Sequence, residues 1–244
     1  MIVAGIDIGG SGIKGAPVDV VRGEPVTERL RIPTPQPSTP RACAEVVAEI
    51  VDELGIDGPF GCTVPAIVRR GTVLSAANID SSWVGVQAVD LFSEATGRNV
   101  TVLNDADAAG IAEARFGAAA GRQGAVLVLT FGTGIGSALI HDGVLVPNFE
   151  LGHLEFKGGD AEHYISGRLR NELDWETWAR RLDEYLSHVT FTLAPDLIVM
   201  GGGVSKDWAK FSDRIDPGVE VVPALLRNHA GLVGAALAAA EIDY

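Results

Sequence analysis

The stretch DIGGSGIKG at residues 7–15 lies at the end of a short apolar run that begins at Ile2. An apolar run that ends in clustered glycines predicts a strand entering a tight loop. Glycines at this spacing also satisfy the G-x-G-x-x-G pattern of dinucleotide-binding folds, which requires a helix after the loop. Here Pro17 and several β-branched residues follow, and they favour a second strand. The Walker pattern does not match either, because glycine rather than serine or threonine follows Lys14.

A second glycine loop, FGTGIG at residues 131–136, lies between the apolar runs 125–131 and 136–141, and a third, GGG at 201–203, follows the run 197–200. Glycine loops at strand ends let backbone N–H groups approach phosphate oxygens closely. We therefore expect a phosphoryl-donor site, in which Asp7 either caps its turn or holds a water of a phosphate-bound magnesium ion. The expected donor-binding residues are Asp7, Gly9, Gly10, Ser11, Gly12, Lys14, Gly132, Thr133, Gly134, Gly201, Gly202 and Gly203.

The remaining pattern predicts an α/β protein made of two similar halves, each of which opens with a strand and a glycine loop and continues into helices. Apolar periodicity predicts helices at 41–54, 86–95, 106–116, 175–193 and 231–240. Further strands are expected at 13–20, 25–32, 60–64, 67–74 and 100–103, and residues 201–203 are expected to form a turn.

Composition excludes several classes of function. The 244 residues include 32 acidic and 19 basic side chains, and the net charge of −13 opposes binding to nucleic acids or to anionic membranes. The chain shows no basic leader and no apolar run long enough to span a bilayer, so we expect a cytoplasmic protein. Two cysteines are too few for a disulfide framework or a thiolate metal cage.

Two groups of polar residues are candidates for the acceptor side of the reaction. Asp105 follows an expected strand and precedes an expected helix, where it either caps that helix or accepts the proton of an attacking hydroxyl group. Glu150, His153 and Glu162 gather in a stretch with no helical pattern. Carboxylates and imidazoles suit sugar hydroxyls, which both donate and accept hydrogen bonds, although a lone His153 would also fit a satisfied core position.

Four stretches together resemble the ROK sugar kinases of the actin-like ATPase superfamily: DIGGSGIKG at 7–15, AANIDSSW at 76–83, LNDADAAG at 103–110 and FELGHLEF at 149–156. The resemblance spans nearly the whole chain, and within the family these motifs are most similar to those of polyphosphate glucokinases. It implies that Asp105 is the catalytic base, that the donor loops serve polyphosphate or ATP with Mg²⁺, and that the sugar is bound by Asn78, Asn104, Glu150, His153 and Glu162.

The resemblance also implies the architecture, which is two actin-like (ribonuclease H-like) domains around a central cleft. We expect the first domain at 1–107, the second at 108–230, and the C-terminal helix at about 231–244 packing back on the first. The family's habit implies a homodimer. Many relatives hold zinc with the histidine of their Glu-x-Gly-His motif and three nearby cysteines, but residues 154–161 contain no cysteine, so we expect no zinc site.

The expected activity is transfer of a phosphoryl group from polyphosphate, and possibly from ATP, to the 6-hydroxyl of glucose. One alternative is a strictly ATP-dependent hexose or N-acetylhexosamine kinase of the same family. Another is a sugar-responsive repressor, which the expected start of the first strand at Ile2 disfavours because it leaves no room for a DNA-binding domain ahead of it. A non-catalytic sugar-binding regulator is disfavoured by Asp105 beside two expected phosphate loops. A long polyanion also needs basic side chains beyond the donor loops, and the candidates are Arg69, Arg70, Lys206 and Lys210.

Overall fold

The computed structural model describes residues 1–77 and 79–240 of the chain. Their contacts divide the chain into two compact units. Unit 1 comprises residues 1–112 together with the segment from residue 229 onward, and unit 2 comprises residues 113–228. The division falls after Ala112, beyond the expected boundary at 107, and the helix that begins at Ala230 belongs to the first unit.

Unit 1 is built on a six-stranded sheet in the order β3-β2-β1-β5-β8, in which β4 also pairs with β2. β1 (Ile2–Gly9) and β2 (Gly12–Asp19) form the hairpin expected from the first glycine loop, and β5 and β8 extend the sheet in parallel with β1. The other strands of unit 1 are β3 (Glu24–Pro25), β4 (Leu30–Ile32), β5 (Phe60–Val64), β6 (Val68–Arg69), β7 (Thr72–Val73) and β8 (Val100–Asn104). Its helices are α1 (Pro40–Glu53), η1 (Ser81–Trp83), α2 (Ala88–Thr96), α3 (Asp105–Phe116), whose last turn belongs to unit 2, and α6 (Ala230–Ala239).

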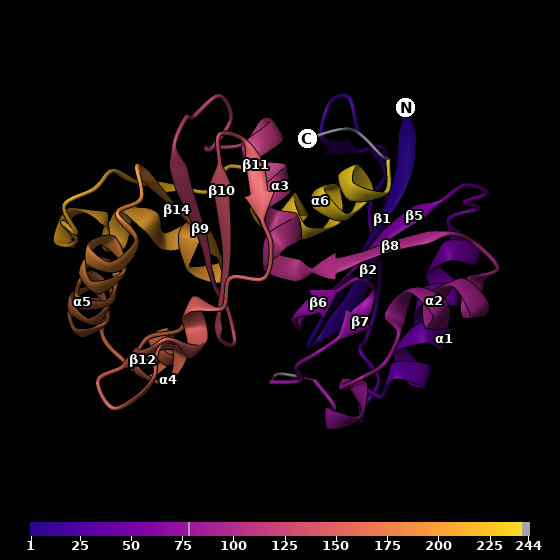
Figure 1. Cartoon of the computed structure of the whole chain (residues 1–244), viewed down its shortest axis with the longest axis horizontal. Coiled ribbons are helices and arrows are strands. Elements are labelled where there is room, and N and C mark those ends of the chain that lie inside the picture. Colours follow the sequence, from indigo (N-terminus) through magenta and orange to yellow (C-terminus); the bar gives the residue numbers. More distant parts are fainter. Residues whose placement is uncertain (78, 241–244) are drawn as a thin grey trace. The chain divides into compact units, whose positions relative to one another are not determined.

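The two faces of the unit 1 sheet are covered by different helices, because successive strand residues point to opposite sides. Ile6 and Ile8 of β1 face the apolar core that α1 and α2 complete. Gly5 of β1 and Gly61 of β5 face α6, which lies along these strands (Figure 1). A Cβ atom at Gly61 would lie 1.8 Å from the carbonyl oxygen of Ala235, so only glycine permits this close helix packing.

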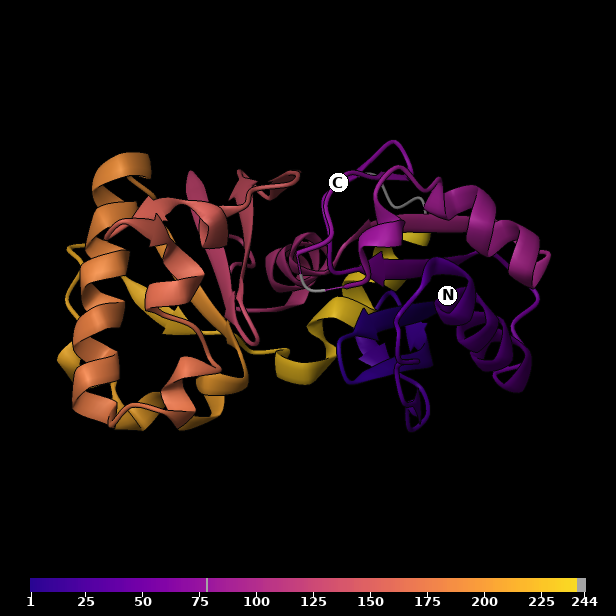
Figure 2. The same cartoon turned by 90° about the horizontal axis from the view of Figure 1, so that it is seen from below.

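Unit 2 is built on a five-stranded sheet in the order β11-β10-β9-β14-β15, in which β9 and β14 run parallel. The long helix α5 (Trp175–Leu193), orange in Figure 2, shares its apolar core with one face of that sheet. The strands of unit 2 are β9 (Ala125–Phe131), β10 (Ile135–His141), β11 (Val144–Val146), β12 (Glu155–Phe156), β13 (Gly159–Asp160), β14 (Leu197–Gly202) and β15 (Val221–Pro223). The short helices are η2 (Leu151–His153), α4 (Ala161–Tyr164), η3 (Leu169–Asn171), η4 (Gly203–Lys210) and η5 (Ser212–Arg214), and η6 (Arg227–His229) spans the second boundary between the units.

Four expectations from the sequence differ from the structure. The strand expected at 67–74 is the hairpin of β6 and β7, because Arg70 and Gly71 both have positive φ and form a turn. The strand expected at 25–32 is two short strands, β3 and β4, because Pro25 lacks an N–H to continue the ladder and residues 26–29 are polar or exposed. The turn expected at 201–203 is absent from this described segment, because β14 continues through Gly202 and η4 begins at Gly203. Glu162, expected in a non-helical stretch, lies in the four-residue helix α4. Within the described residues, none of the helices combines the length and the apolar character needed to span a membrane.

Candidate active site

The first glycine loop brings a carboxylate and an ammonium group together across adjacent strands. Asp7 of β1 is the register partner of Lys14 on β2 and of Thr63 on β5. The Lys14 ammonium donates to Asp7 Oδ2 at 3.2 Å, and the Thr63 hydroxyl donates to Asp7 Oδ1 at 3.0 Å. Thr63 was not expected from the sequence, because its contact with Asp7 depends on a pairing of strands that are 56 residues apart in the chain.

A second cation, which the sequence did not reveal, lies against the first glycine loop. Arg31 of β4 donates to the backbone oxygen of Ser11 at 2.9 Å. A Cβ atom at Gly12 would lie 2.7 Å from Nε of Arg31, so the guanidinium group lies directly against the loop. Among the described residues, no heavy atom other than those of Gly10 and its chain neighbours lies within 4 Å of the Cβ position of Gly10, which leaves open space beside the loop. The geometry suits a phosphate group held by backbone amides and flanked by positive charge.

Asp7 meets the chemical requirements for a magnesium-associated carboxylate. Its side chain is 19% exposed, so solvent reaches it, and both oxygens are already oriented by a donor. Oxygen ligands and retained waters are the coordination that Mg²⁺ prefers. Asp7 therefore fits the expected role of holding a magnesium-bound water.

Asn104 and Asp105 lie at the carboxyl end of β8, the same edge of the sheet as the end of β1, because β1, β5 and β8 run parallel. Asn104 is buried, and its Oδ1 accepts from the backbone N–H groups of Ala106 and Asp107 at 2.7 and 3.0 Å. Its Nδ2 donates to the carbonyl of Ala66 at 3.0 Å. Asn104 thus caps α3, and partly buried Asp105, which also accepts from Ala106 at 2.9 Å, is the first residue of that helix. Because Oδ1 of Asn104 accepts from two backbone N–H groups, any hydrogen bond from Asn104 to the sugar must use the side-chain N–H that is not bonded to Ala66.

The second glycine loop connects β9 and β10 and is held by backbone contacts. The N–H of Gly132 donates to the carbonyl of Gly134 at 3.0 Å, and the N–H of Arg168 donates to the carbonyl of Gly132 at 2.9 Å. Thr133 is exposed between them. Gly202 pairs with Phe131 in the parallel ladder, so the third glycine stretch meets the second loop at one edge of the unit 2 sheet. Carboxyl ends of parallel strands are where open α/β sheets bind ligands.

The segment with Glu150 and His153 is fastened to β10 by hydrogen bonds of Ser137. The Ser137 hydroxyl donates to the carbonyl of Phe149 at 2.7 Å and accepts from the N–H of Leu151 at 2.9 Å. A Cβ atom at Gly152 would lie 2.4 Å from the carbonyl oxygen of Ile135, so glycine is required where the segment crosses the strand. These contacts place Glu150 and His153 next to the strand that leaves the second loop.

Three of the expected sugar-binding residues interact electrostatically within unit 2. Glu162 Oε2 accepts from the N–H of Ile135 at 3.2 Å, directly after the loop. Burial raises the pKa of the Glu150 carboxyl, an effect that the charge of His153 opposes and that of Glu162 reinforces. The pKa of His153 is raised chiefly by its hydrogen bond to Asp160, with further support from the charges of Glu162 and Glu150 against the effect of burial. His153 is therefore a polar, partly exposed group rather than a core residue.

Asp160 is a member of this cluster that sequence reasoning missed. Its Oδ2 lies 2.9 Å from Nδ1 of His153. The seven-residue separation fits no helical or strand period, and only the short β12–β13 hairpin brings the two side chains together. Asn78, also expected to bind sugar, lies outside the described residues. Across the parts of the chain that the structure describes, no group of three or more His, Cys, Asp or Glu side chains is arranged to hold a metal ion.

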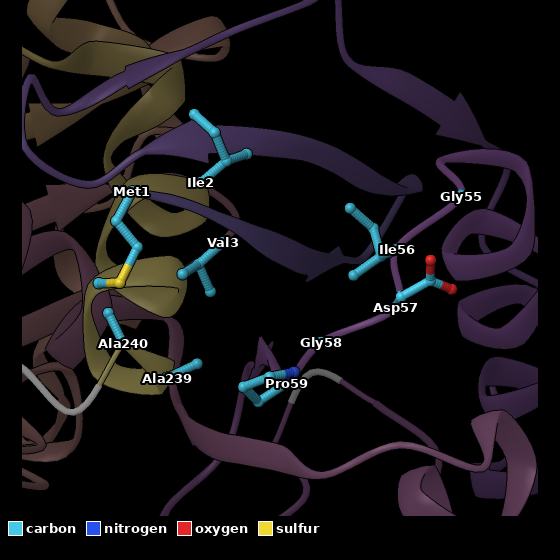
Figure 3. Close-up of a pocket in the computed structure, with 10 residues that line it drawn as sticks. All are labelled: Met1, Ile2, Val3, Gly55, Ile56, Asp57, Gly58, Pro59, Ala239 and Ala240. Carbon is cyan, nitrogen blue, oxygen red and sulfur yellow. The ribbon is translucent and has the colours of Figure 1, made fainter.

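A cavity of about 420 Å³ in unit 1 lies away from these residues. It is lined by the start of β1, the segment before β5 and the end of α6, and Figure 3 shows Met1 and Ala240 on one side and Ile56 and Asp57 on the other. β1 enters the sheet here and reaches the glycine loop only at its opposite end. The lining is mainly apolar, with Asp57 as its one ionisable side chain, so the cavity offers no group of polar residues suited to phosphoryl transfer.

Two α/β units, each with a glycine loop at the end of a strand, match solved sugar kinases of the actin-like ATPase fold. The profile of the ROK family matches residues 3–162. The chain belongs to the ROK family.

Individual relatives refine this assignment. The chain is 47% identical over 237 residues to a polyphosphate glucokinase of Mycobacterium tuberculosis, a match covering 96% of this chain and 89% of that protein. It is similar to the crystal structure of an inorganic polyphosphate/ATP-glucomannokinase from Arthrobacter sp. strain KM, with a TM-score of 0.94, 50% identity and 98% coverage of both chains. A ROK family glucokinase from Streptomyces griseus in complex with glucose and AMPPNP is 25% identical, with a TM-score of 0.85, 99% coverage of this chain and 100% of that one.

Proposed function

We propose that this chain phosphorylates glucose at its 6-hydroxyl, with inorganic polyphosphate or ATP as the phosphoryl donor. The observation that carries the proposal is the match, over nearly the full length of both proteins, to polyphosphate glucokinases at 47% identity. The polar groups at the loop edges of both units agree with it, because phosphoryl transfer needs positioned charges more than covalent chemistry.

In the proposed reaction Asp105 takes the proton from the attacking hydroxyl group. A carboxylate at the first residue of α3 is held in place by its backbone, and Asn104 takes the main capping bonds of the helix. Glu150, His153 and Glu162 hold the sugar through its hydroxyl groups. The amides of the glycine loop in each unit are the proposed ligands of donor oxygens, and Lys14 and Arg31 lie close to the first loop.

Asp7 is the residue that would hold a magnesium-bound water beside the donor. When bound, Mg²⁺ neutralises charge on the phosphoryl oxygens as the transition state forms. Activity should therefore disappear when magnesium is chelated and return when it is restored. The homodimer and the cytoplasmic location implied by the family resemblance also remain part of this proposal.

The test is a side-by-side assay of glucose phosphorylation with ATP and with polyphosphate, and with both donors together. We expect transfer from each and competition between them, because both present a terminal phosphoryl group to the same loops. Transfer from ATP alone would contradict the polyphosphate assignment and favour the strictly ATP-dependent alternative. Glucose binding with transfer from neither donor would favour a non-catalytic regulator.

A second acceptor follows from one specific comparison. The Arthrobacter protein, which is 50% identical to this chain, is named a glucomannokinase. Mannose is therefore proposed as an additional acceptor. The same assay with mannose in place of glucose tests this, and a rate at the level of the sugar-free blank would contradict it.

A further inference from the structure

Two segments flank the glycine loop Gly132–Gly134, and the first of them comprises residues 166–168. The N–H of Arg168 donates to the carbonyl of Gly132 at 2.9 Å. A Cβ atom at Gly167 would lie 2.8 Å from the same oxygen, so glycine lets this segment press against the loop. Arg168 is thus fixed beside the loop through its backbone, while its side chain is exposed.

The second flanking segment is the end of β14 together with η4. A Cβ atom at Gly202 would lie 2.4 Å from the carbonyl oxygen of Phe131, the residue that precedes the loop. η4 starts at Gly203, and Lys206 is its fourth residue. At the rise of about 2.0 Å per residue of a 3₁₀ helix, Lys206 lies only about 6 Å further along the axis. Its side chain is exposed.

A basic residue just after the first segment and another within the second have charges that are already engaged. The Arg170 guanidinium lies 3.8 Å from the ring centroid of Trp175 and donates to the carbonyl of Leu173 at 2.7 Å. The Lys210 ammonium lies 2.6 Å from Asp207 Oδ1 and 5.4 Å from the same Trp175 ring. Lys210, which the sequence suggested for a polyanion path, is therefore tied within unit 2.

Arg168 and Lys206 differ from these neighbours. Over residues 1–77 and 79–240, no hydrogen bond, ion pair or ring contact of either side chain is present. In a protein with a net charge of −13, two exposed cations without such contacts beside one glycine loop are notable for their position. Free, exposed cations attract a polyanion without first breaking an ion pair.

We propose that Arg168 and Lys206 form a polyanion track, a binding site for the phosphoryl units of inorganic polyphosphate that lie beyond the one being transferred. The inference rests on the proposed donor and adds the residues that distinguish a long polyanion from a nucleotide. Arginine supplies a planar fork of donors to phosphate oxygens, and lysine supplies a compact charge. A nucleotide carries fewer phosphates and depends less on this track.

The test compares Arg168→Ala, Lys206→Ala and the double variant with the wild type, using long-chain polyphosphate, tripolyphosphate and ATP at saturating glucose. We expect the KM for long polyphosphate to rise roughly threefold to tenfold in each single variant and roughly additively in free energy in the double variant. The KM for ATP should change by less than about twofold, within the range of an exposed charge that makes no contact. Added salt should weaken polyphosphate binding less in the double variant than in the wild type, since fewer ionic contacts remain to be screened.

Lys210→Ala is the matched control, because it removes an exposed lysine of the same helix that is already paired with Asp207. If the KM for polyphosphate rises no more in the Arg168 and Lys206 variants than in Lys210→Ala, the proposed polyanion track is wrong. Failure of the track and failure of the proposed function are separated by calorimetry, which measures the binding of long polyphosphate to the same proteins without requiring transfer. Polyphosphate that binds through Arg168 and Lys206 without being a donor supports the track and contradicts the donor assignment.

An independent observation concerns Asp160, which lies 2.9 Å from Nδ1 of His153. A carboxylate accepting from Nδ1–H leaves Nε2 of the neutral ring as a hydrogen-bond acceptor, and it fixes the orientation of the ring. We infer that Asp160 is a positioning residue that sets the tautomer of His153 for a sugar hydroxyl. This role rests on the proposed binding of sugar by His153.

The test uses Asp160→Ala and Asp160→Asn, since Asn retains an acceptor oxygen and loses the charge. We expect the glucose KM to rise roughly tenfold in Asp160→Ala and less in Asp160→Asn, with the donor KM unchanged in both. ¹⁵N spectra of the His153 ring should show the Nδ1–H tautomer in the wild type and a mixture in Asp160→Ala. Asp142→Asn, beside His141 at 3.5 Å, is the matched control and should alter neither property. An unchanged tautomer ratio in a folded Asp160→Ala protein overturns the inference.

Discussion

The polar residues of the two units are positioned by different means. In unit 1, Asp7, Thr63 and Asn104 lie at the ends of parallel strands, and strand register determines their neighbours. In unit 2, Glu150 and His153 lie on a short connecting segment that a few hydrogen bonds attach to β10. Register tolerates little displacement, whereas a connecting segment can change its sequence without disturbing the sheet. In the proposed function, unit 1 supplies the proton acceptor Asp105 and the magnesium-associated Asp7, while unit 2 supplies Glu150, His153 and Glu162 for the sugar and a second loop for the donor.

The largest expected effect is a loss of turnover without a loss of glucose affinity. Asp105→Asn keeps the shape of the side chain and removes the proton acceptor, so turnover should fall by roughly 10²-fold or more. Glucose affinity, measured by calorimetry, should stay near that of the wild type. Near-normal turnover in this variant would remove Asp105 from the role of base.

A second variant addresses the donor edge of unit 1. Asp7→Asn removes one charge from the pair with Lys14 and weakens the hold on a magnesium-bound water, so turnover should fall by roughly tenfold to 10²-fold. Raising the magnesium concentration should recover part of the rate. A magnesium dependence identical to that of the wild type would show that Asp7 only braces Lys14.

A substitution in the sugar-binding segment of unit 2 should instead weaken glucose binding. His153→Ala removes one group that bonds the sugar, and glucose affinity should fall by about 1–3 kcal/mol, the cost of leaving a buried hydrogen-bond partner unpaired. Affinity for the donor should be unaffected. Equal losses for glucose and for ATP, measured by calorimetry, would contradict the division of roles between the units.

The smallest expected effect is a change in the Tm of Glu150→Gln, which should be opposite in sign to its effect on glucose binding. Burial raises the pKa of Glu150, so the folded chain holds this proton more tightly than the unfolded chain. The associated stability is fully present below the ordinary value of 4.5 and is lost as the pH rises through the raised value. Glu150→Gln removes the desolvated charge, so its Tm at about pH 8 should be higher than that of the wild type, while glucose binds more weakly.

The pH dependence provides the check on this last variant. The difference in Tm should shrink as the pH is lowered toward 4.5, because the wild-type carboxyl becomes neutral there. A Tm difference that stays constant with pH would assign the effect to packing instead of charge. A lower Tm for Glu150→Gln at all pH values would show that the charge has a stabilising partner.

The sequence was informative where local chemistry decides structure. The hairpin around DIGGSGIKG was predicted from its glycines, and the helices expected at 41–54 and 86–95 from apolar periodicity correspond to α1 and α2. Thr39 caps α1 through the N–H of Ala42 at 3.4 Å, and Gly97 adopts a left-handed conformation with φ of 67°. Such signals depend on neighbours in the chain, so one sequence suffices to read them.

The residues that the sequence did not reveal depend on long-range pairing. Thr63 reaches Asp7 only through the parallel register of β5 and β1, and Arg31 reaches the first loop only because β4 pairs with β2. Asp160 reaches His153 through a hairpin of two-residue strands, too short to leave an alternating pattern. The helix that contains Glu162 has four residues, fewer than a helical period needs to be recognised.

The path of the chain reverses the usual order of folding during synthesis. Unit 2 is continuous in sequence, but unit 1 lacks α6 until residues 230–239 have left the ribosome. α6 is almost entirely buried, and its backbone meets Gly5 and Gly61 on one face of the sheet. Until α6 arrives, that face stays open and prone to aggregation, although its strands are made first. Chains that end at residue 228 and are held on the ribosome by a linker long enough to fill the exit tunnel should therefore contain a protease-resistant unit 2 and a cleavable unit 1, and pulse proteolysis of these ribosome-bound chains would detect the difference. A chaperone that covers exposed sheet faces would therefore be needed longest by unit 1, although its strands are synthesised first.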